Sequence, residues 1–358
     1  MKVAIGSHII EGPWGGGNLF SLNLKNYLKE QEISVYHNLA SNEIDIILLT
    51  EPRIESSTSS ITLFESLMYK KFVNKNVKIV HRINECDERK NTNYVNKKML
   101  SISKKVDFTI FVSNWIYELY SNQGFSKENY KVILSGSDSK IFNNTDKNIW
   151  NSSRKLRIVT HHWGNNWNKG FEIYSLLDNL LQDKQFSQKF QFTYIGNTPK
   201  DFTFNNSKLI QPISGSKLAT ELKQHDLYIT GSLNEPSGNH QIEASLCGLP
   251  VLYINSGGIP EYQEEYGTEF NIDNIEEVLE NVYKNYSFYY KKNKPFPFEA
   301  ELMSRDYLTI FKSIYKTRKS KKVSIYLYFY KFLNKIKFIK FIKIISAKII
   351  YHLRKVVK

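Results

Sequence analysis

The chain has 358 residues, of which 41% are hydrophobic, 14% aromatic and 23% charged. This composition is typical of a globular protein and excludes a disordered, collagenous or low-complexity chain. At roughly 150 residues per domain, the length predicts two domains of ordinary size.

The formal net charge of +14 is concentrated at one end of the chain. Residues 311–358 contain fifteen Lys and Arg and no Asp or Glu, which leaves 34 basic against 35 acidic residues for the remainder. A neutral body argues against nucleic-acid binding. The terminal cations alternate with Ile, Phe and Tyr, which favours an anionic membrane surface as the partner of residues 318–358. The alternative is a terminal helix that docks on the protein's own body.

Cys86 and Cys247 are too few for a disulfide framework, and neither lies in a CxxC motif or a Cys/His cluster with metal-ligand spacing. We therefore expect a reducing, cytoplasmic compartment. The apolar run in MKVAIGSHII breaks at Gly6 and is too short for a signal peptide, so it predicts a first strand.

Short apolar runs rich in Val and Ile alternate with longer amphipathic stretches, which predicts alternating strands and helices. The first series comprises KVAIGS (2–7), IDIILLT (44–50), VKIVHR (77–82) and VDFTIFVS (106–113). The second series follows the polar segment 143–155 and comprises LRIVTHH (156–162), FQFTYIG (190–196), KLIQPI (208–213), DLYITGS (226–232) and LPVLYIN (249–255). Two such series predict an α/β protein with two doubly wound, Rossmann-like domains that face each other across a cleft. That cleft is the expected ligand site.

These patterns also give the domain boundaries. We expect a first domain at 1–148, a second domain at 149–295, a helix at 296–317 that packs back toward the first domain, and a basic amphipathic helical tail at 318–358.

The segment from 226 to 261 carries the most informative polar residues. A strand ends in the loop that holds Glu235, and a helix begins near Gly238 and Asn239, so Glu243 lies on its first turns. Both carboxylates can therefore face one crevice at the carboxyl edge of the sheet. The amides at 238–240, His240 included, are a natural seat for a diphosphate or a sugar hydroxyl. The alternative is that Glu243 complements the helix dipole and Glu235 is a solvated loop residue.

The string EPSGNHQIEASLCGLPVLYINSGGIPE, with its E-x7-E motif, resembles the donor-binding signature of retaining glycosyltransferases of family four, which have the GT-B fold. Four other segments resemble the family in order and spacing. GPWGGGNLFSLNLKNYLKEQ resembles its Gly-rich first loop and the helix that follows, and VDFTIFVSNW resembles its strand with a Ser. VILSGSDSKIF resembles its Gly-x-Asp turn, and KLRIVTHHWGNNWNKGFEIY resembles the segment whose Lys-Gly opens a second-domain helix. The resemblance covers roughly residues 1–315.

The resemblance implies a role for each matching residue. Glu243 binds the nucleotide ribose, Glu235 binds a hydroxyl of the donor sugar, and Lys169 neutralises the departing diphosphate. His81, at the end of its strand, resembles the first-domain residue that contacts the donor sugar. The implied catalytic residues are thus Glu235, Lys169 and His81. The implied donor site comprises Gly16, Gly17, His162, Asn165, Lys169, Glu235, Gly238, Asn239, His240 and Glu243.

The sequence departs from the family at one charged position. In the family an Arg usually precedes the Lys by about five positions, whereas HHWGNNWNKG contains no Arg. His161, His162, Asn165 and Asn166 are the candidates to replace it by hydrogen bonding.

The resemblance implies a retaining, nucleotide-sugar-dependent hexosyltransferase. Its acceptor would be a hydroxyl of a glycan or lipid-linked molecule in cell-surface polysaccharide synthesis, such as capsule or exopolysaccharide, at the inner face of the membrane. The nucleotide sugar is a substrate, and neither a cofactor nor a metal is implied. Because the Arg is missing, a catalytically silent relative that binds a glycan or partner protein at the membrane is the alternative. An isomerase of the nucleotide-sugar epimerase type is disfavoured by the E-x7-E motif.

Overall fold

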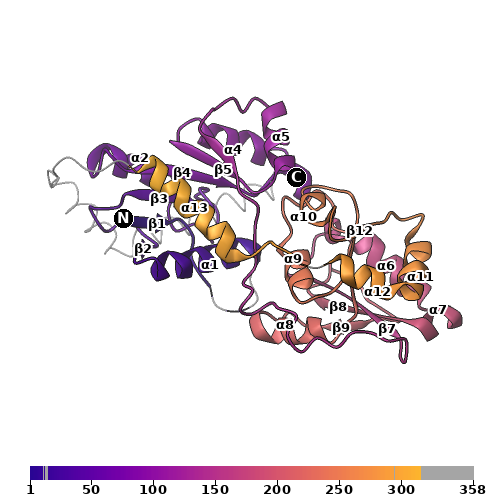
Figure 1. Cartoon of the computed structure of the whole chain (residues 1–358). Helices are drawn as coiled ribbons and strands as arrows, with labels where there is room; N and C mark the ends of the chain where they lie inside the picture. Colours follow the sequence, from indigo (N-terminus) through magenta and orange to yellow (C-terminus); the bar gives the residue numbers. More distant parts are fainter. Residues whose placement is uncertain (11, 13–14, 294, 316–358) are drawn as a thin grey trace.

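The computed structural model describes residues 1–10, 12, 15–293 and 295–315 (Figure 1). These residues form two six-stranded parallel sheets, each covered by helices on both faces. The predicted pair of doubly wound α/β domains is therefore confirmed. The tail predicted at 318–358 lies outside the described residues.

The first sheet is built from the N-terminal part of the chain. Its central strand β3 (Ile46–Leu49) is buried at every position, as expected when helices cover both faces of a parallel sheet. In spatial order the strands are β2 (Ser34–Tyr36), β1 (Lys2–Ile5), β3, β4 (Lys78–Ile83), β5 (Phe108–Phe111) and β6 (Tyr130–Val132). Its helices are α1 (Gly16–Glu30), α2 (Leu63–Phe72), α3 (Asp87–Lys90), α4 (Val95–Ser103) and α5 (Asn114–Asn122).

The second sheet is built around β7 and β8. These strands pair without a break from Leu156 opposite Phe190 to His162 opposite Gly196, which carries two histidines to the carboxyl edge of the sheet. In spatial order the strands are β12 (Thr268–Glu269), β11 (Val251–Tyr253), β10 (Leu227–Thr230), β7 (Leu156–His162), β8 (Phe190–Gly196) and β9 (Lys208–Ile210). Its helices are η1 (Trp167–Lys169), α6 (Phe171–Leu180), α7 (Lys184–Lys189), α8 (Gly215–Lys223), α9 (Asn239–Leu246), α10 (Pro260–Gln263), α11 (Ile275–Lys284) and α12 (Tyr286–Lys292).

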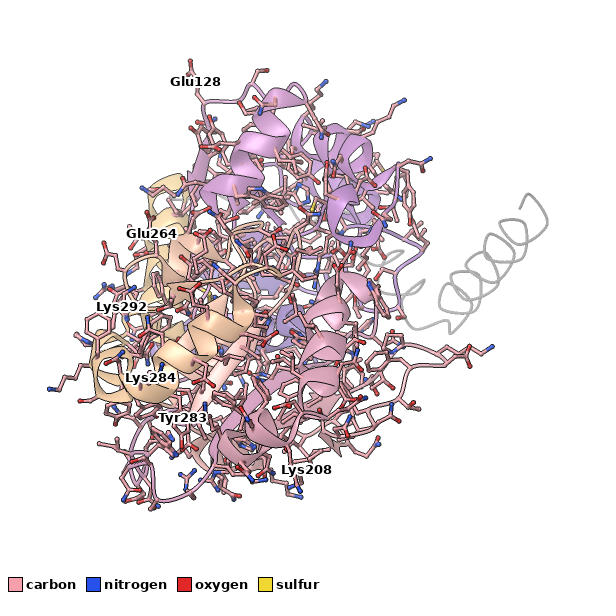
Figure 2. All side chains as sticks on the ribbon, turned by 90° about the vertical axis from the view of Figure 1, so that its right-hand side faces the viewer. Glu128, Lys208, Glu264, Tyr283, Lys284 and Lys292 are labelled. Carbon is pink, nitrogen blue, oxygen red and sulfur yellow. The ribbon has the colours of Figure 1, made fainter. Side chains whose placement is uncertain are left out.

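The polar segment 143–155, which contains no helix or strand, connects the two sheets. It is anchored by Trp150, whose ring centroid lies 4.9 Å from that of Tyr283 on α11, labelled in Figure 2. The Trp150 indole also donates a hydrogen bond to the Arg154 carbonyl at 2.8 Å. The connection is therefore fixed to the second domain.

A last helix, α13 (Ala300–Ile314), returns from the second domain to the first, where Figure 1 shows it across the sheet near α1. Its apolar face, with Met303, Tyr307 and Phe311, joins the core formed by α1 and the first sheet. The rings of Tyr307 and Phe20 lie 5.0 Å apart. The chain thus crosses between the domains twice.

Polar contacts hold the second domain against the first. The carboxylate of Glu261 on α10 accepts hydrogen bonds from the amides of Asn114 and Trp115 at 2.7 Å, so it caps α5 of the other domain. The hydroxyl of Tyr262 accepts from the Ser135 amide at 2.9 Å and donates to the Val112 carbonyl at 3.0 Å. The two sheet edges that carry polar loops are therefore held facing each other.

Candidate functional site

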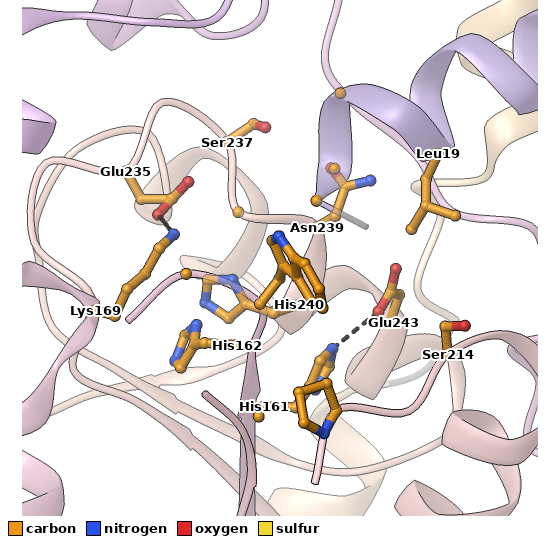
Figure 3. A pocket seen from close by; sticks show the side chains of 18 of the residues that line it. Leu19, His161, His162, Lys169, Ser214, Glu235, Ser237, Asn239, His240 and Glu243 are labelled. Carbon is orange, nitrogen blue, oxygen red and sulfur yellow. Dashed lines mark hydrogen bonds and ion pairs between the residues drawn. The ribbon is translucent and has the colours of Figure 1, made fainter. Parts of the chain in front are cut away.

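A cavity of about 300 Å³ lies between the two domains. The first domain contributes residues 15–17 at the start of α1 and the segment after β4. The second domain contributes the ends of β7 and β8 and the segment from Glu235 to Glu243. Figure 3 shows the second-domain side chains opposite Leu19 of α1.

Lys169 is placed by the turn that follows it. Gly170 has φ +100°, and a Cβ there would lie 2.7 Å from the Gly231 carbonyl carbon, so only glycine allows this turn to pack against the end of β10. The buried Lys169 ammonium then lies 2.5 Å from Glu235 Oε2, and Figure 3 marks this ion pair.

Glu235 is the counter-ion of two cations. Besides Lys169, the Arg89 guanidinium reaches it from the first domain, with Nη2 at 3.0 Å from Oε1. Burial alone raises the pKa of Glu235, but the neighbouring Arg89 and Lys169 charges lower it far below its usual range. The carboxylate is therefore ionised at neutral pH.

Two helix N-termini meet at the cavity. Gly238, which precedes α9, has φ +70° and provides no side-chain cap, and Gly15 precedes α1 without a side-chain cap. A Cβ on Gly16 would lie 3.3 Å from Cγ of Asn239, so the two N-termini approach each other across the cleft. Uncapped first-turn amides and the helix dipoles both favour an anion between them.

Glu243 lines the same cavity from the second turn of α9. His161 Nε2 hydrogen-bonds Glu243 Oε2 at 2.9 Å, which Figure 3 marks with a dashed line. The carboxylate is only 4% exposed, and the His161 ring holds it in one orientation. An ionised carboxylate fixed in this way can accept hydrogen bonds from two neighbouring hydroxyls.

His162 and His240 line the same cavity with their ring centroids 4.5 Å apart. His162 Nε2 lies 2.7 Å from the Tyr174 hydroxyl, and His240 Nε2 lies 3.0 Å from the Thr230 hydroxyl. Burial lowers the pKa of both imidazoles well below the usual value, so they are neutral at pH 7. They can form hydrogen bonds but add no charge.

The charged side chains that line the cavity are mostly basic. With the histidines counted as neutral, the basic groups in the lining outnumber the acidic ones four to two, and two of the basic groups, Arg89 and Lys90, also pair with Glu85. The lining is therefore net positive and favours an anion such as a diphosphate. The basic residues are Arg82, Arg89, Lys90 and Lys169, and the acidic residues are Glu235 and Glu243.

The structure brings most of the sequence-predicted donor residues to this cavity. These are Gly16, Gly17, His162, Lys169, Glu235, Gly238, Asn239, His240 and Glu243. Two predicted residues are not among the described residues that line it. Asn165 is exposed, and its neighbour Asn166 faces the cavity instead.

His81 is the other predicted residue that does not line the cavity. It is fully buried inside the first domain, where its Nδ1 lies 3.0 Å from the Ser103 hydroxyl. Burial lowers its pKa to about 3, so the ring is neutral. The structure therefore does not place His81 against the cavity, whereas the next residue, Arg82, lines it.

Arg89 is the main cavity residue missing from the sequence-based set. The signal was present, because charged residues follow the strand VKIVHR at the edge where the cleft was expected. Its contact with Glu235, 146 positions further along the chain, could not be inferred from spacing.

Within the described part of the chain, no group of three or more His, Cys, Asp and Glu is arranged to hold a metal ion. The helices among these same residues include none with the length and hydropathy needed to cross a membrane.

Comparison with known proteins agrees with this architecture. Residues 203–291 match the sequence profile of glycosyl transferases group 1. A search of curated protein sequences found no match.

Solved structures share the fold over most of the chain. Sucrose-phosphate synthase from Thermosynechococcus elongatus is 13% identical, with a TM-score of 0.64 over 87% of this chain and 98% of that one. A glycosyltransferase from Rickettsia africae is 16% identical, with a TM-score of 0.61 over 87% and 98%. HepE of Anabaena in complex with UDP-glucose is 13% identical, with a TM-score of 0.61 over 87% and 97%. The chain therefore has the GT-B fold.

Proposed function

We propose that the protein is a glycosyltransferase that takes a sugar from a nucleotide-sugar donor bound in the cavity. One observation carries the proposal: two uncapped helix N-termini, Lys169 and Arg89 surround a cavity whose lining is net positive. A diphosphate is the anion that fits this charge, and a nucleotide sugar contains one. The profile match at 203–291 and the UDP-glucose bound in HepE support the same proposal.

The donor is oriented by the two carboxylates. With the diphosphate between Lys169 and the start of α9, Glu243 accepts hydrogen bonds from the ribose hydroxyls. Glu235, at the other end of the segment 235–243, accepts a hydrogen bond from a hydroxyl of the sugar. His161 acts through Glu243 as a positioning residue, because it fixes the carboxylate at 2.9 Å.

The transfer proceeds with retention at the anomeric carbon. The bond between the anomeric carbon and the diphosphate oxygen breaks, and the leaving diphosphate takes the electron pair. The acceptor hydroxyl attacks the same face of the sugar, and its proton passes to a phosphate oxygen. Lys169 and the amides of α9 stabilise the charge that develops on the leaving group, the kind of interaction that lowers a barrier most.

The acceptor is a hydroxyl of a glycan or lipid-linked molecule in cell-surface polysaccharide synthesis. The composition of residues 318–358 supports this part of the proposal, since cations interleaved with Ile, Phe and Tyr favour an anionic membrane surface. Binding of this segment would raise the concentration of the protein at the membrane surface that carries a lipid-linked acceptor.

A donor panel tests the proposal. The purified protein is incubated with UDP-, GDP-, ADP-, CDP- and dTDP-sugars, and slow hydrolysis and the melting temperature are measured. We expect one nucleotide series to raise the melting temperature and its sugar conjugate to be hydrolysed. Binding without hydrolysis or transfer would support a catalytically silent relative. If no nucleotide binds, the proposed donor site is wrong.

A further inference from the structure

Arg89 belongs to the first domain, but its side chain and backbone contact the second. Its Nη2 lies 3.0 Å from Glu235 Oε1, and its carbonyl accepts a hydrogen bond from Asn168 Nδ2 at 3.3 Å. The preceding Glu88 carbonyl accepts one from Asn234 Nδ2, also at 3.3 Å. The end of α3 is thus attached to the two second-domain loops that carry Lys169 and Glu235.

The guanidinium of Arg89 has donors to spare. It has five N–H bonds; Nη1 donates to Glu85 at 2.9 Å and Nη2 contacts Glu235. Nε is buried with no hydrogen-bond partner among the described residues, although the side chain lines the cavity. Because that Nε is inaccessible, the N–H groups that can meet a ligand in the cavity are those of Nη1 and Nη2, each of which has two N–H bonds and makes one contact.

The carboxylates around Arg89 are shared with other cations. Glu235 also pairs with Lys169, and Glu85 also pairs with Arg53 and Lys90. Lys169 and Arg89 therefore have one carboxylate, Glu235, between them in the cavity. A phosphate group accepts bidentate hydrogen bonds from an arginine, so it can replace Glu235 as the partner of both.

We propose that Arg89 is a diphosphate-binding residue supplied by the first domain. Glu235 holds the Arg89 guanidinium at the cavity. When the donor binds, its β-phosphate, which carries the sugar, becomes the acceptor for the spare N–H groups of Arg89, and one ligand then joins both domains across the cleft. This inference rests on the proposed function and names the group that completes its charge.

Comparing a nucleoside diphosphate with the matching monophosphate tests the inference, because the monophosphate lacks the β-phosphate. Affinities of the five nucleoside diphosphates of the donor panel (UDP, GDP, ADP, CDP and dTDP) and of the matching monophosphates are measured by calorimetry on the full-length chain. For the base that binds, Arg89→Gln should weaken the diphosphate by about tenfold or more and the monophosphate by less than about threefold. Arg89→Lys keeps the charge without the bidentate geometry, so its loss should be intermediate.

Arg53→Gln is the matched control, because Arg53 pairs with the same Glu85 at 3.5 Å but is not among the described residues that line the cavity. It should change neither affinity by more than about twofold. If Arg89→Gln does not fold, the diphosphate to monophosphate ratio of Arg89→Lys decides. An unchanged ratio overturns the inference while the proposed function stands. If the unaltered protein binds no nucleotide, the proposed function fails, and this inference with it.

Discussion

Replacing Glu235 by Gln separates the roles of charge and shape in the cavity. The change removes the carboxylate that lies between Lys169 and Arg89, at 2.5 and 3.0 Å, and leaves an amide of the same size. Breaking a buried pair by removing one partner costs about 3 to 5 kcal/mol. Arg89 keeps its contact with Glu85, so we expect the lower end of this range, or a fall in melting temperature of roughly 6 to 12 °C.

Diphosphate binding should change in the opposite direction. A carboxylate roughly 5 Å from a phosphate charge opposes binding by on the order of 3 kcal/mol at an effective dielectric constant of 20. Some of this gain is lost because Glu235 no longer orders the two cations. We therefore expect Glu235→Gln to bind the free nucleoside diphosphate that the donor panel selects, UDP where the base is uracil, at least about threefold more tightly, measured by calorimetry. UDP should also raise its melting temperature by more than that of the unaltered protein.

Turnover should fall even though the nucleotide binds. The donor sugar loses a hydrogen bond to a charged acceptor, which corresponds to about 10- to 150-fold in hydrolysis rate. Glu264→Gln, on the exposed surface labelled in Figure 2, is the control and should change neither binding nor turnover. Weaker UDP binding by a folded Glu235→Gln protein would refute the assignment of Lys169 and Arg89 to the diphosphate.

Three further predictions concern Glu243, His81 and the basic tail at 318–358. Glu243→Gln should weaken UDP and UMP alike by about tenfold in calorimetry, because both contain the ribose; full affinity for either would contradict the ribose assignment. Burial lowers the pKa of His81 from its ordinary 6.5 to about 3, so between pH 7 and pH 5 only the unfolded chain takes up a proton at this residue. The free energy of unfolding should therefore fall by about 2 kcal/mol over this range because of His81. The free energy of unfolding of His81→Gln, measured in urea, should lack this share of the pH dependence. If it fell with pH as steeply as that of the unaltered protein, His81 would not be buried as a neutral ring. Deleting residues 318–358 should abolish sedimentation with anionic vesicles and leave donor hydrolysis intact; unchanged sedimentation would contradict the membrane assignment.

The strands that the sequence did not predict share a position in the fold. All nine apolar runs correspond to strands of the structure, but β2, β6 and β12 were missed. Each is two or three residues long, lies at a sheet edge and is largely unburied. Edge strands bury little apolar surface, so they lack the periodic pattern on which strand prediction depends.

Site residues that lie close together in the chain could be placed at one sheet edge from the sequence, whereas contacts between distant residues could not be predicted. Glu235, Gly238 and Glu243 lie within nine positions of each other, so the local sequence already determined that they share one sheet edge. His81 and Arg82 show the limit of that reasoning, because successive residues of a strand face opposite sides of the sheet. His81 faces Ser103 in the core, whereas the Arg82 guanidinium lies 4.0 Å from the Phe20 ring and lines the cavity. Which of two adjacent residues faces a cleft depends on the packing of distant helices.

The central claim is that one nucleotide ligand is bound by both domains at once. Hydrogen-exchange mass spectrometry of the full-length chain, with and without saturating UDP or the diphosphate selected by the donor panel, tests it directly. We predict slower exchange in the first-domain segments 15–20 and 84–90 and in the second-domain segments 161–170 and 235–243, which together surround the cavity. Unchanged exchange in the first-domain segments 15–20 and 84–90 while the second-domain segments are protected, or unchanged exchange in all four segments, would contradict the account.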